Sequence, residues 1–377
     1  AAKGKDLGHI NSITAIGNST KTDNKIGKFG VGFKSVFTYT DEPEIYDDYF
    51  RFKIENYMVP TLIKNDHPFR KPKETLFFIP FKNPDKAYRE IKKKLQSLDN
   101  PILFLRNLTK ITWFEISAPE DIHIYTKTIA EKVSHGTIKG EFIVLNNCSQ
   151  QCKLWLFTRA IEVKGNGTHN ISIGYYINDK GDIDTARRPY VYCFFPTKEK
   201  YGLCMIAHAP FELVDSRQNV KNDSEINVNL SNSLANLAAD SLEVLRKIGI
   251  ESGHLLINDN LFDIVPVEYD YDNDGIIDRN HFYQAFITKL KIGNYFLTRD
   301  GRYVGAHNAL LPNPINLADF ISDSQLTELR LSKKAFIAAN ITTRDDAWSY
   351  LTDEIEVEEF TSENLAPAST KSLLVTS

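Results

Sequence analysis

Sulfur-containing residues are scarce in this sequence, and their spacing does not build a metal site. The 377 residues include four cysteines and two methionines. Cys148 and Cys152 are separated by three residues, a wider spacing than that of the usual zinc knuckle. Cys193 and Cys204 do not form a second, matching knuckle. We therefore expect free thiols in a reducing cytoplasm and no metal site.

Long apolar runs and an excess of one charge are also lacking. No stretch approaches the roughly 20 apolar residues that a membrane-spanning helix needs, and no secretory signal is recognisable. We expect a soluble cytoplasmic protein that does not engage a membrane. The 45 Lys and Arg residues nearly balance the 49 Asp and Glu residues, for a net charge of −4, and this balance gives no indication of nucleic-acid binding.

Two common hydrolase motifs are missing, and one apparent calcium motif is incomplete. No histidine or serine lies in a Gly-x-Ser-x-Gly or His-Glu-x-x-His setting. Residues 270–278 resemble the start of a calcium loop, with carboxylates at positions one, three, five and nine and glycine at six. Position twelve needs a bidentate carboxylate, but it is His281. We interpret the segment as an acidic turn before a helix over 279–291, with calcium binding as the alternative.

The most informative feature present is a glycine-rich segment over residues 26–37. Gly27, Gly30 and Gly32 have no Cβ to obstruct a ligand, and the N–H groups of such a turn, feeding the first turn of a helix, suit a phosphate. Phe33, Val36 and Phe37 then fit one buried helical face. The segment is not a Walker A loop, because Lys34-Ser35 follows phenylalanine and not glycine.

Residues 16–39 resemble the lid and second glycine box of the GHKL ATPases, which include heat-shock chaperones, mismatch-repair ATPases and histidine kinases. Within that superfamily the closest likeness is to sacsin-like ATPases. The resemblance implies ATP as the bound nucleotide. It places the phosphates on the N–H groups of Gly27, Phe29, Gly30, Val31, Gly32 and Phe33, and it makes Ser19, Thr20 and Lys21 the lid candidates.

Two downstream segments extend the resemblance. Residues 73–81 are similar to the third box of the family, in which Thr75 matches the threonine on the adenine side and Glu74 replaces the usual glycine. Residues 209–219 resemble the catalytic loop of the middle domain. Its arginine, here Arg217, reaches the γ-phosphate in relatives, and a guanidinium suits a phosphate well. The alternative is a surface arginine paired with Asp215.

Relatives carry two further elements upstream of the lid that this chain does not contain. One supplies a Glu that orients water and an Asn that holds magnesium, and the other is an Asp-x-Gly-x-Gly turn that reads adenine. We therefore expect a fragment or the product of a truncated gene. Magnesium-ATP is expected in the intact parent. Hydrolysis by this chain is not expected, because the chain lacks the carboxylate that orients water and the residue that anchors the metal. A non-catalytic interaction or scaffold protein, with a protein client or complex partner, is the alternative function.

The expected fold class is α+β. The resemblance implies a two-layer α/β sandwich of the GHKL (Bergerat) type, N-terminally incomplete, over residues 1–118. A β-rich middle domain with the catalytic-loop arginine follows over 119–250, and a smaller mixed region with a disordered tail over 251–377. Alternating residues predict strands at 44–46, 49–54, 75–81, 103–105, 110–116, 137–146, 152–161, 171–177, 191–196 and 203–207. Apolar periodicity predicts helices at 84–98 and 230–248, the latter ending at Gly249.

Overall fold

The structure is a computed structural model. It describes residues 10, 13–14, 33–98, 100–105, 107–147, 150–163, 167–214, 216, 218–269, 277–313, 315–322, 325–326, 329, 331, 333–338 and 345–365. The chain is mixed α+β, which confirms the fold class predicted from the sequence. It divides into two compact units, one comprising residues 1–99 and 164–168 and the other the rest. The predicted domain boundaries after residues 118 and 250 stay predictions.

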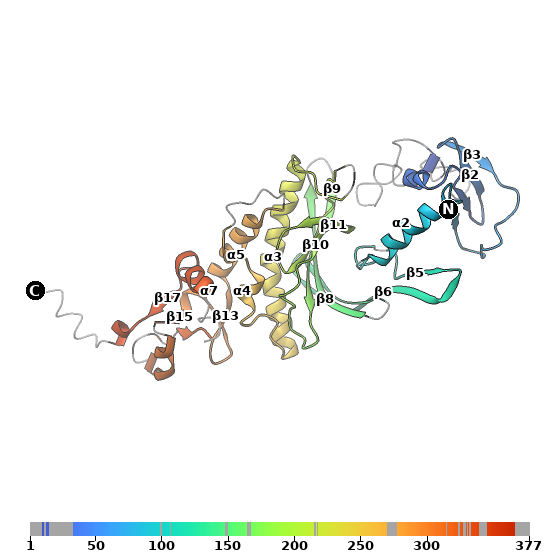
Figure 1. Ribbon diagram of the computed structural model, residues 1–377. Coiled ribbons are helices and arrows are strands. Elements are labelled where there is room, and N and C mark those ends of the chain that lie inside the picture. The colour runs from blue at the N-terminus through green and yellow to red at the C-terminus, as the bar shows by residue number, and fades with distance from the viewer. Residues whose placement is uncertain are drawn as a thin grey trace, which may run out of the picture. The chain divides into compact units, whose positions relative to one another are not determined.

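Unit 1 contains a four-stranded antiparallel sheet with the order β3-β2-β1-β4, of which β2 and β3 are labelled in Figure 1. Its elements are the 3₁₀ helix η1 (Phe33–Thr38), β1 (Glu44–Tyr46), β2 (Arg51–Glu55), β3 (Val59–Leu62), β4 (Leu76–Phe78) and helix α2 (Pro84–Gln96). Strand β3 was not predicted, because Pro60 interrupts its pattern. A proline is tolerated there because β3 lies at the edge of the sheet.

The core of unit 1 lies between η1 and one face of this sheet. Ile45 pairs with Phe52 on one side and with Phe77 on the other, so these three side chains share a face. Ile45, Phe52 and Ile54 are buried together with Phe37 of η1. The end of the glycine-rich segment is therefore fixed on the sheet by apolar contact.

Unit 2 is built on an eight-stranded sheet with the order β11-β10-β12-β9-β8-β7-β6-β5. Strands β5 to β9 form a continuous antiparallel meander, and β12 lies between β9 and β10, parallel to β10. The strands are β5 (Lys110–Glu115), β6 (Ala118–His135), β7 (Ile138–Asn147), β8 (Gln150–Val163), β9 (Gly167–Ile177), β10 (Tyr190–Cys193), β11 (Phe195–Lys200) and β12 (Met205–His208).

One face of this sheet is covered by the 28-residue helix α3 (Glu225–Ser252) (Figure 1). Ser224 caps its N-terminus by accepting a hydrogen bond from the Asn227 N–H, and Gly253 ends it with a left-handed φ of 73°. The predicted end at Gly249 is wrong. Gly249 is a buried helical residue at which a Cβ would lie 2.8 Å from the Leu256 backbone nitrogen, so glycine is needed there for close packing.

The same core continues into the C-terminal part of the chain. Helix α5 (Arg279–Ile292) packs on α3, and its residues Phe282, Phe286 and Leu290 are fully buried. An ion-pair cluster links three elements here: Asp240 of α3 binds Arg159 of β8 and Lys289 of α5, each at 2.7 Å. Residues on both sides of position 250 therefore share one hydrophobic core.

The opposite face of the sheet is covered by residues 100–105. Leu154 and Leu156 of β8 point to this face and pack with Ile102, Leu103 and Phe104, whereas Trp155 and Phe157 point toward α3. The segment is a turn and not the predicted strand. Lys127 of β6 holds it by donating hydrogen bonds of 3.1 Å to the carbonyls of Leu103 and Leu105, and burial lowers the pKa of this ammonium.

Smaller elements complete unit 2. Strands β13 and β14 form a hairpin with Gly301 in its turn at φ 79°, and β15 pairs in parallel with β16 and β17. The elements are α4 (Leu261–Ile264), β13 (Asn294–Leu297), β14 (Tyr303–Gly305), η2 (Ala306–Asn308), β15 (Ala309–Pro312), η3 (Ile315–Phe320), β16 (Ala335–Phe336), α7 (Asp345–Ser349), η4 (Tyr350–Glu354), β17 (Glu358–Phe360) and η5 (Ser362–Leu365).

Among the described helices, none combines the length and apolar character required to cross a bilayer.

Candidate functional site

Most residues of the predicted nucleotide site lie outside the described part of the chain. These are the phosphate candidates Gly27, Phe29, Gly30, Val31 and Gly32, the lid candidates Ser19, Thr20 and Lys21, and Arg217. Two predicted site residues are described, Phe33 and Thr75. Both belong to unit 1.

Phe33 begins η1 and anchors the end of the glycine-rich segment. Its ring centroid lies 6.1 Å from that of Phe77 on β4. The ring centroids of Phe37 and Tyr57 are 4.8 Å apart. Lys34 donates hydrogen bonds to the carbonyls of Thr14, at 3.0 Å, and of Tyr57. Burial lowers the pKa of Lys34. These contacts fix the first turn after the glycines.

Thr75 immediately precedes β4 at one end of the four-stranded sheet. Its hydroxyl donates a 2.8 Å hydrogen bond to Oδ2 of Asp47, which directly follows β1. The other carboxylate oxygen of Asp47 accepts from the Tyr49 N–H at 3.2 Å. Thr75 is solvent-exposed. The predicted adenine-side residue is therefore tethered to the turn between β1 and β2.

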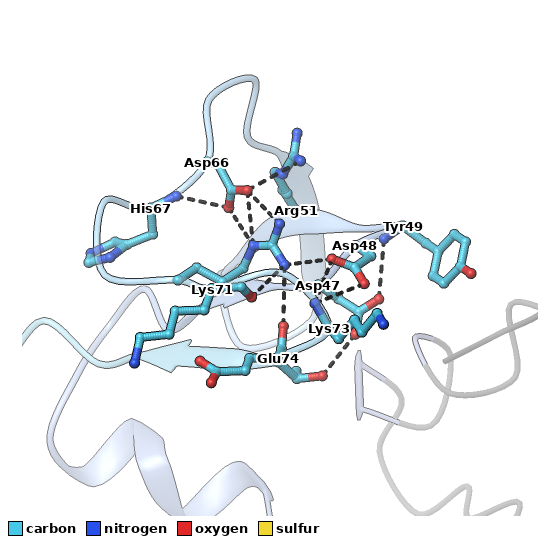
Figure 2. Close-up of polar contacts among 11 residues, drawn as sticks. Asp47, Asp48, Tyr49, Arg51, Asp66, His67, Lys71, Lys73 and Glu74 are labelled. Carbon is cyan, nitrogen blue, oxygen red and sulfur yellow. Dashed lines mark hydrogen bonds and ion pairs between the residues drawn. The ribbon is translucent and has the colours of Figure 1, made fainter.

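Arg70 is the centre of a polar network that fixes the loop before Thr75, and Figure 2 shows the network members Asp48, Asp66 and Glu74. Its guanidinium binds both oxygens of Asp66 at 2.7–2.9 Å and Oδ1 of Asp48 at 2.7 Å. It also donates to the carbonyls of Lys71, at 3.2 Å, and Glu74, at 3.4 Å. Only 8% of the Arg70 side chain is exposed. The network joins the β3–β4 loop to the β1–β2 turn.

Charge pairing in this network shifts the titration of its members. The hydrogen bond from Arg70 lowers the pKa of Asp66 to about 2 and also lowers the pKa of Asp48. The pKa of Arg70 is raised, chiefly through its hydrogen bonds to Asp66. All three groups therefore stay charged throughout the neutral range.

The Asp66 pair should make unit 1 sensitive to acid. An unfolded Asp has a pKa of about 3.9, so the stabilisation from the lowered pKa is complete above that value and is lost as the pH falls toward 2. Asp66→Asn is expected to flatten the fall in thermal midpoint of unit 1 between pH 5 and pH 2, as followed by circular dichroism. Asp41→Asn, which removes an exposed 3.2 Å pair with Lys82, is the control. A wild-type slope in Asp66→Asn would contradict this role.

In unit 2, the segment predicted to be a catalytic loop forms a narrow hairpin. Leu213 and Val220 form a β-bridge. The Val214 N–H donates to the Asn219 carbonyl at 3.0 Å, and the Lys221 N–H donates to the Glu212 carbonyl at 2.8 Å. Arg217 falls in the intervening residues.

Asn227 of α3 holds the base of this hairpin. It is fully buried, its Oδ1 accepts from the Glu212 N–H, and its Nδ2 donates to the carbonyls of Glu212 and Lys221, all at 2.9 Å. Asn227 is not among the predicted site residues. An asparagine in register with the buried Leu230 and Leu234 is the signal that could have identified it. No local pattern marks Arg70, whose partners lie 4 and 22 residues away.

In the part of the chain that the structure describes, no group of three or more His, Cys, Asp or Glu side chains is placed to hold a metal ion. Of the apparent calcium loop, only Ile277 and Asp278 are described, and the Asp278 carboxylate accepts from the Asn280 N–H at the start of α5 at 2.8 Å. Cys152, Cys193 and Cys204 are thiols, as predicted.

Comparison with known proteins finds a distant similarity to a much longer protein. The chain is 27% identical over 270 residues to Protein NO VEIN of Arabidopsis thaliana, a match that covers 62% of this chain and 9% of that protein. The chain thus spans less than a tenth of this relative's length. No family profile matches the chain, and no solved structure matches it.

Proposed function

We propose that the chain is the ATP-binding module of a sacsin-like, chaperone-type ATPase of the GHKL superfamily. The proposal rests on the glycine-rich segment that resembles the second glycine box and lid of these enzymes. Its phosphate contacts are the N–H groups of Gly27, Phe29, Gly30, Val31, Gly32 and Phe33. Ser19, Thr20 and Lys21 belong to the lid, Thr75 to the adenine side, and Arg217 to the γ-phosphate.

One structural observation supports this proposal most. The glycine-rich segment leads directly into η1, whose Phe37 is buried against the sheet, and that same sheet carries Thr75 next to the start of β4. Two predicted site segments separated by about forty residues thus belong to one small folded unit. A two-layer sandwich of the GHKL type is the fold that we propose for it, with magnesium accompanying the ATP. Nucleotide-dependent lid closure and domain rearrangement would make ATP a switch.

Calorimetric titration of the chain with ATP, with and without magnesium, tests the proposal. We expect a dissociation constant in the micromolar range, because the glycine box and lid supply the phosphate contacts. Circular dichroism of the same sample establishes that the chain is folded. Absence of binding by the folded chain would overturn the proposal and favour a non-catalytic interaction protein.

A further inference from the structure

The residue before Glu74 has an unusual backbone conformation. Lys73 has a φ of 66°, in the left-handed region that glycine adopts at no steric cost and other residues seldom adopt. Glu74 occupies the position at which the resembling ATPases have glycine. The left-handed residue of this turn is Lys73, one position before Glu74, and it needs support from its surroundings.

The support for Lys73 comes from the Arg70 network. The Lys73 N–H donates to both carboxylate oxygens of Asp48, at 3.3 and 3.2 Å. Arg70 binds Oδ1 of the same carboxylate at 2.7 Å and also reaches the Glu74 carbonyl. Figure 2 shows Asp48 and Lys73 joined by these hydrogen bonds.

The contacts among Arg70, Asp48 and Lys73 restrict the backbone just before Thr75. Once the Glu74 carbonyl and the Lys73 N–H are fixed, the backbone entering β4 has little freedom, and the Thr75 hydroxyl is directed to Asp47. The guanidinium fork is suited to this task because it addresses two carboxylates and two carbonyls from one planar group. A lysine at position 70 would keep the charge and lose that geometry.

We propose that Arg70, acting through Asp48, is a positioning residue for Thr75 in adenine-nucleotide binding, and that it supports the left-handed conformation of Lys73. This inference rests on the proposed function and deepens it. Arg70 touches no part of the nucleotide. It sets the position of the residue that faces the base.

The test is a double-mutant cycle measured by calorimetry on the full chain with ATP. Thr75→Val removes the hydroxyl at nearly constant volume and should weaken ATP binding roughly three- to tenfold, the range of one hydrogen bond. Arg70→Lys should cause a similar loss. The double variant should lose little more than either single variant, because both changes remove the same contact.

Two further measurements separate positioning from general stabilisation. Inorganic tripolyphosphate has no base, so its affinity should be unchanged in Arg70→Lys. Lys73→Gly should restore ATP affinity in the Arg70→Lys background, because glycine adopts the left-handed turn without support. Lys53→Met is the matched control, since it breaks ion pairs of 3.0 and 2.7 Å on β2 of the same sheet and should leave ATP affinity unchanged.

Additive losses, an equal loss of affinity for tripolyphosphate, or no rescue by Lys73→Gly would overturn the positioning role of Arg70 while leaving the proposed function intact. Failure of the wild-type chain to bind ATP would overturn both. If Arg70→Lys does not fold, Asp48→Asn provides the same cycle, because it weakens the Lys73 contact and leaves the pairing of Arg70 with Asp66.

Discussion

Replacing Gly30 or Gly32 by valine is expected to abolish ATP binding without unfolding the chain. A branched side chain at either position would obstruct the approach of phosphate oxygens to the backbone N–H groups and would disfavour the turn. The loss of two such charge-assisted hydrogen bonds corresponds to a roughly 100-fold or greater rise in the dissociation constant. Calorimetry with ATP measures this rise, and circular dichroism reports the fold.

A glycine in a different turn provides the matched control. Gly136 lies between β6 and β7 at φ 56°, and an added Cβ there would meet no atom within 4 Å. Gly136→Val should therefore strain its turn and leave ATP affinity unchanged. Unchanged affinity in both Gly30→Val and Gly32→Val would remove the glycine-rich segment from the nucleotide site.

The largest effect on stability is expected from Phe286→Ala in α5. Phe286 is fully buried in the core shared by α3, α5 and the eight-stranded sheet. Its truncation should lower the free energy of unfolding by roughly 3–5 kcal/mol, through lost transfer energy and the cavity that remains. Urea unfolding, followed by tryptophan fluorescence and by circular dichroism, gives this difference.

The same experiment examines the predicted boundary after residue 250. If residues on both sides unfold together, the summed fluorescence of Trp113, Trp155 and Trp348 and the helical signal will shift to the same lower urea concentration. Two transitions, with only one of them shifted, would show that α5 belongs to a separate domain. Phe320→Ala is the control, because Phe320 is 73% exposed, and its removal should change stability by less than about 0.5 kcal/mol.

Elements with a strong local pattern could be predicted from the sequence. The strand at 44–46 was placed at its observed limits, and the helices at 84–96, 225–252 and 279–292 were found within a few residues of their ends. Each has clear apolar periodicity or a capping residue such as Asn83, which accepts from the Lys86 N–H. Strand β6 was missed because both of its faces are largely polar and exposed, so it lacks a clear alternation.

Errors arose where tertiary contacts override the local pattern. Leu103-Phe104-Leu105 has the composition of a strand, but its backbone carbonyls bind the Lys127 ammonium in place of a neighbouring strand. The predicted strand at 191–196 is two strands, because Phe194 has a φ of 64° and forms the turn of a tight hairpin. A phenylalanine in that conformation has no local signature.

In the candidate site too, residues in a recognisable local segment could be predicted, and residues that act through tertiary contacts could not. The glycine-rich segment, Thr75 and Arg217 were selected by resemblance, and these assignments stay predictions. The residues that hold Thr75 and the hairpin around Arg217 could not be selected in this way. Arg70, Asp48 and Asn227 act through contacts with loops distant in sequence, and those contacts depend on the fold.

The position of β12 between β9 and β10 has a consequence for the order in which the large sheet is assembled. The meander from β5 to β9 needs only neighbouring hairpins and can form as the chain is synthesised. The hairpin of β10 and β11 is made earlier in the sequence than β12, yet it joins the sheet only through β12. It must wait, as a separate hairpin, for residues 205–208. A ribosome-bound chain that ends before β12 should therefore contain a growing meander with β9 as its open edge.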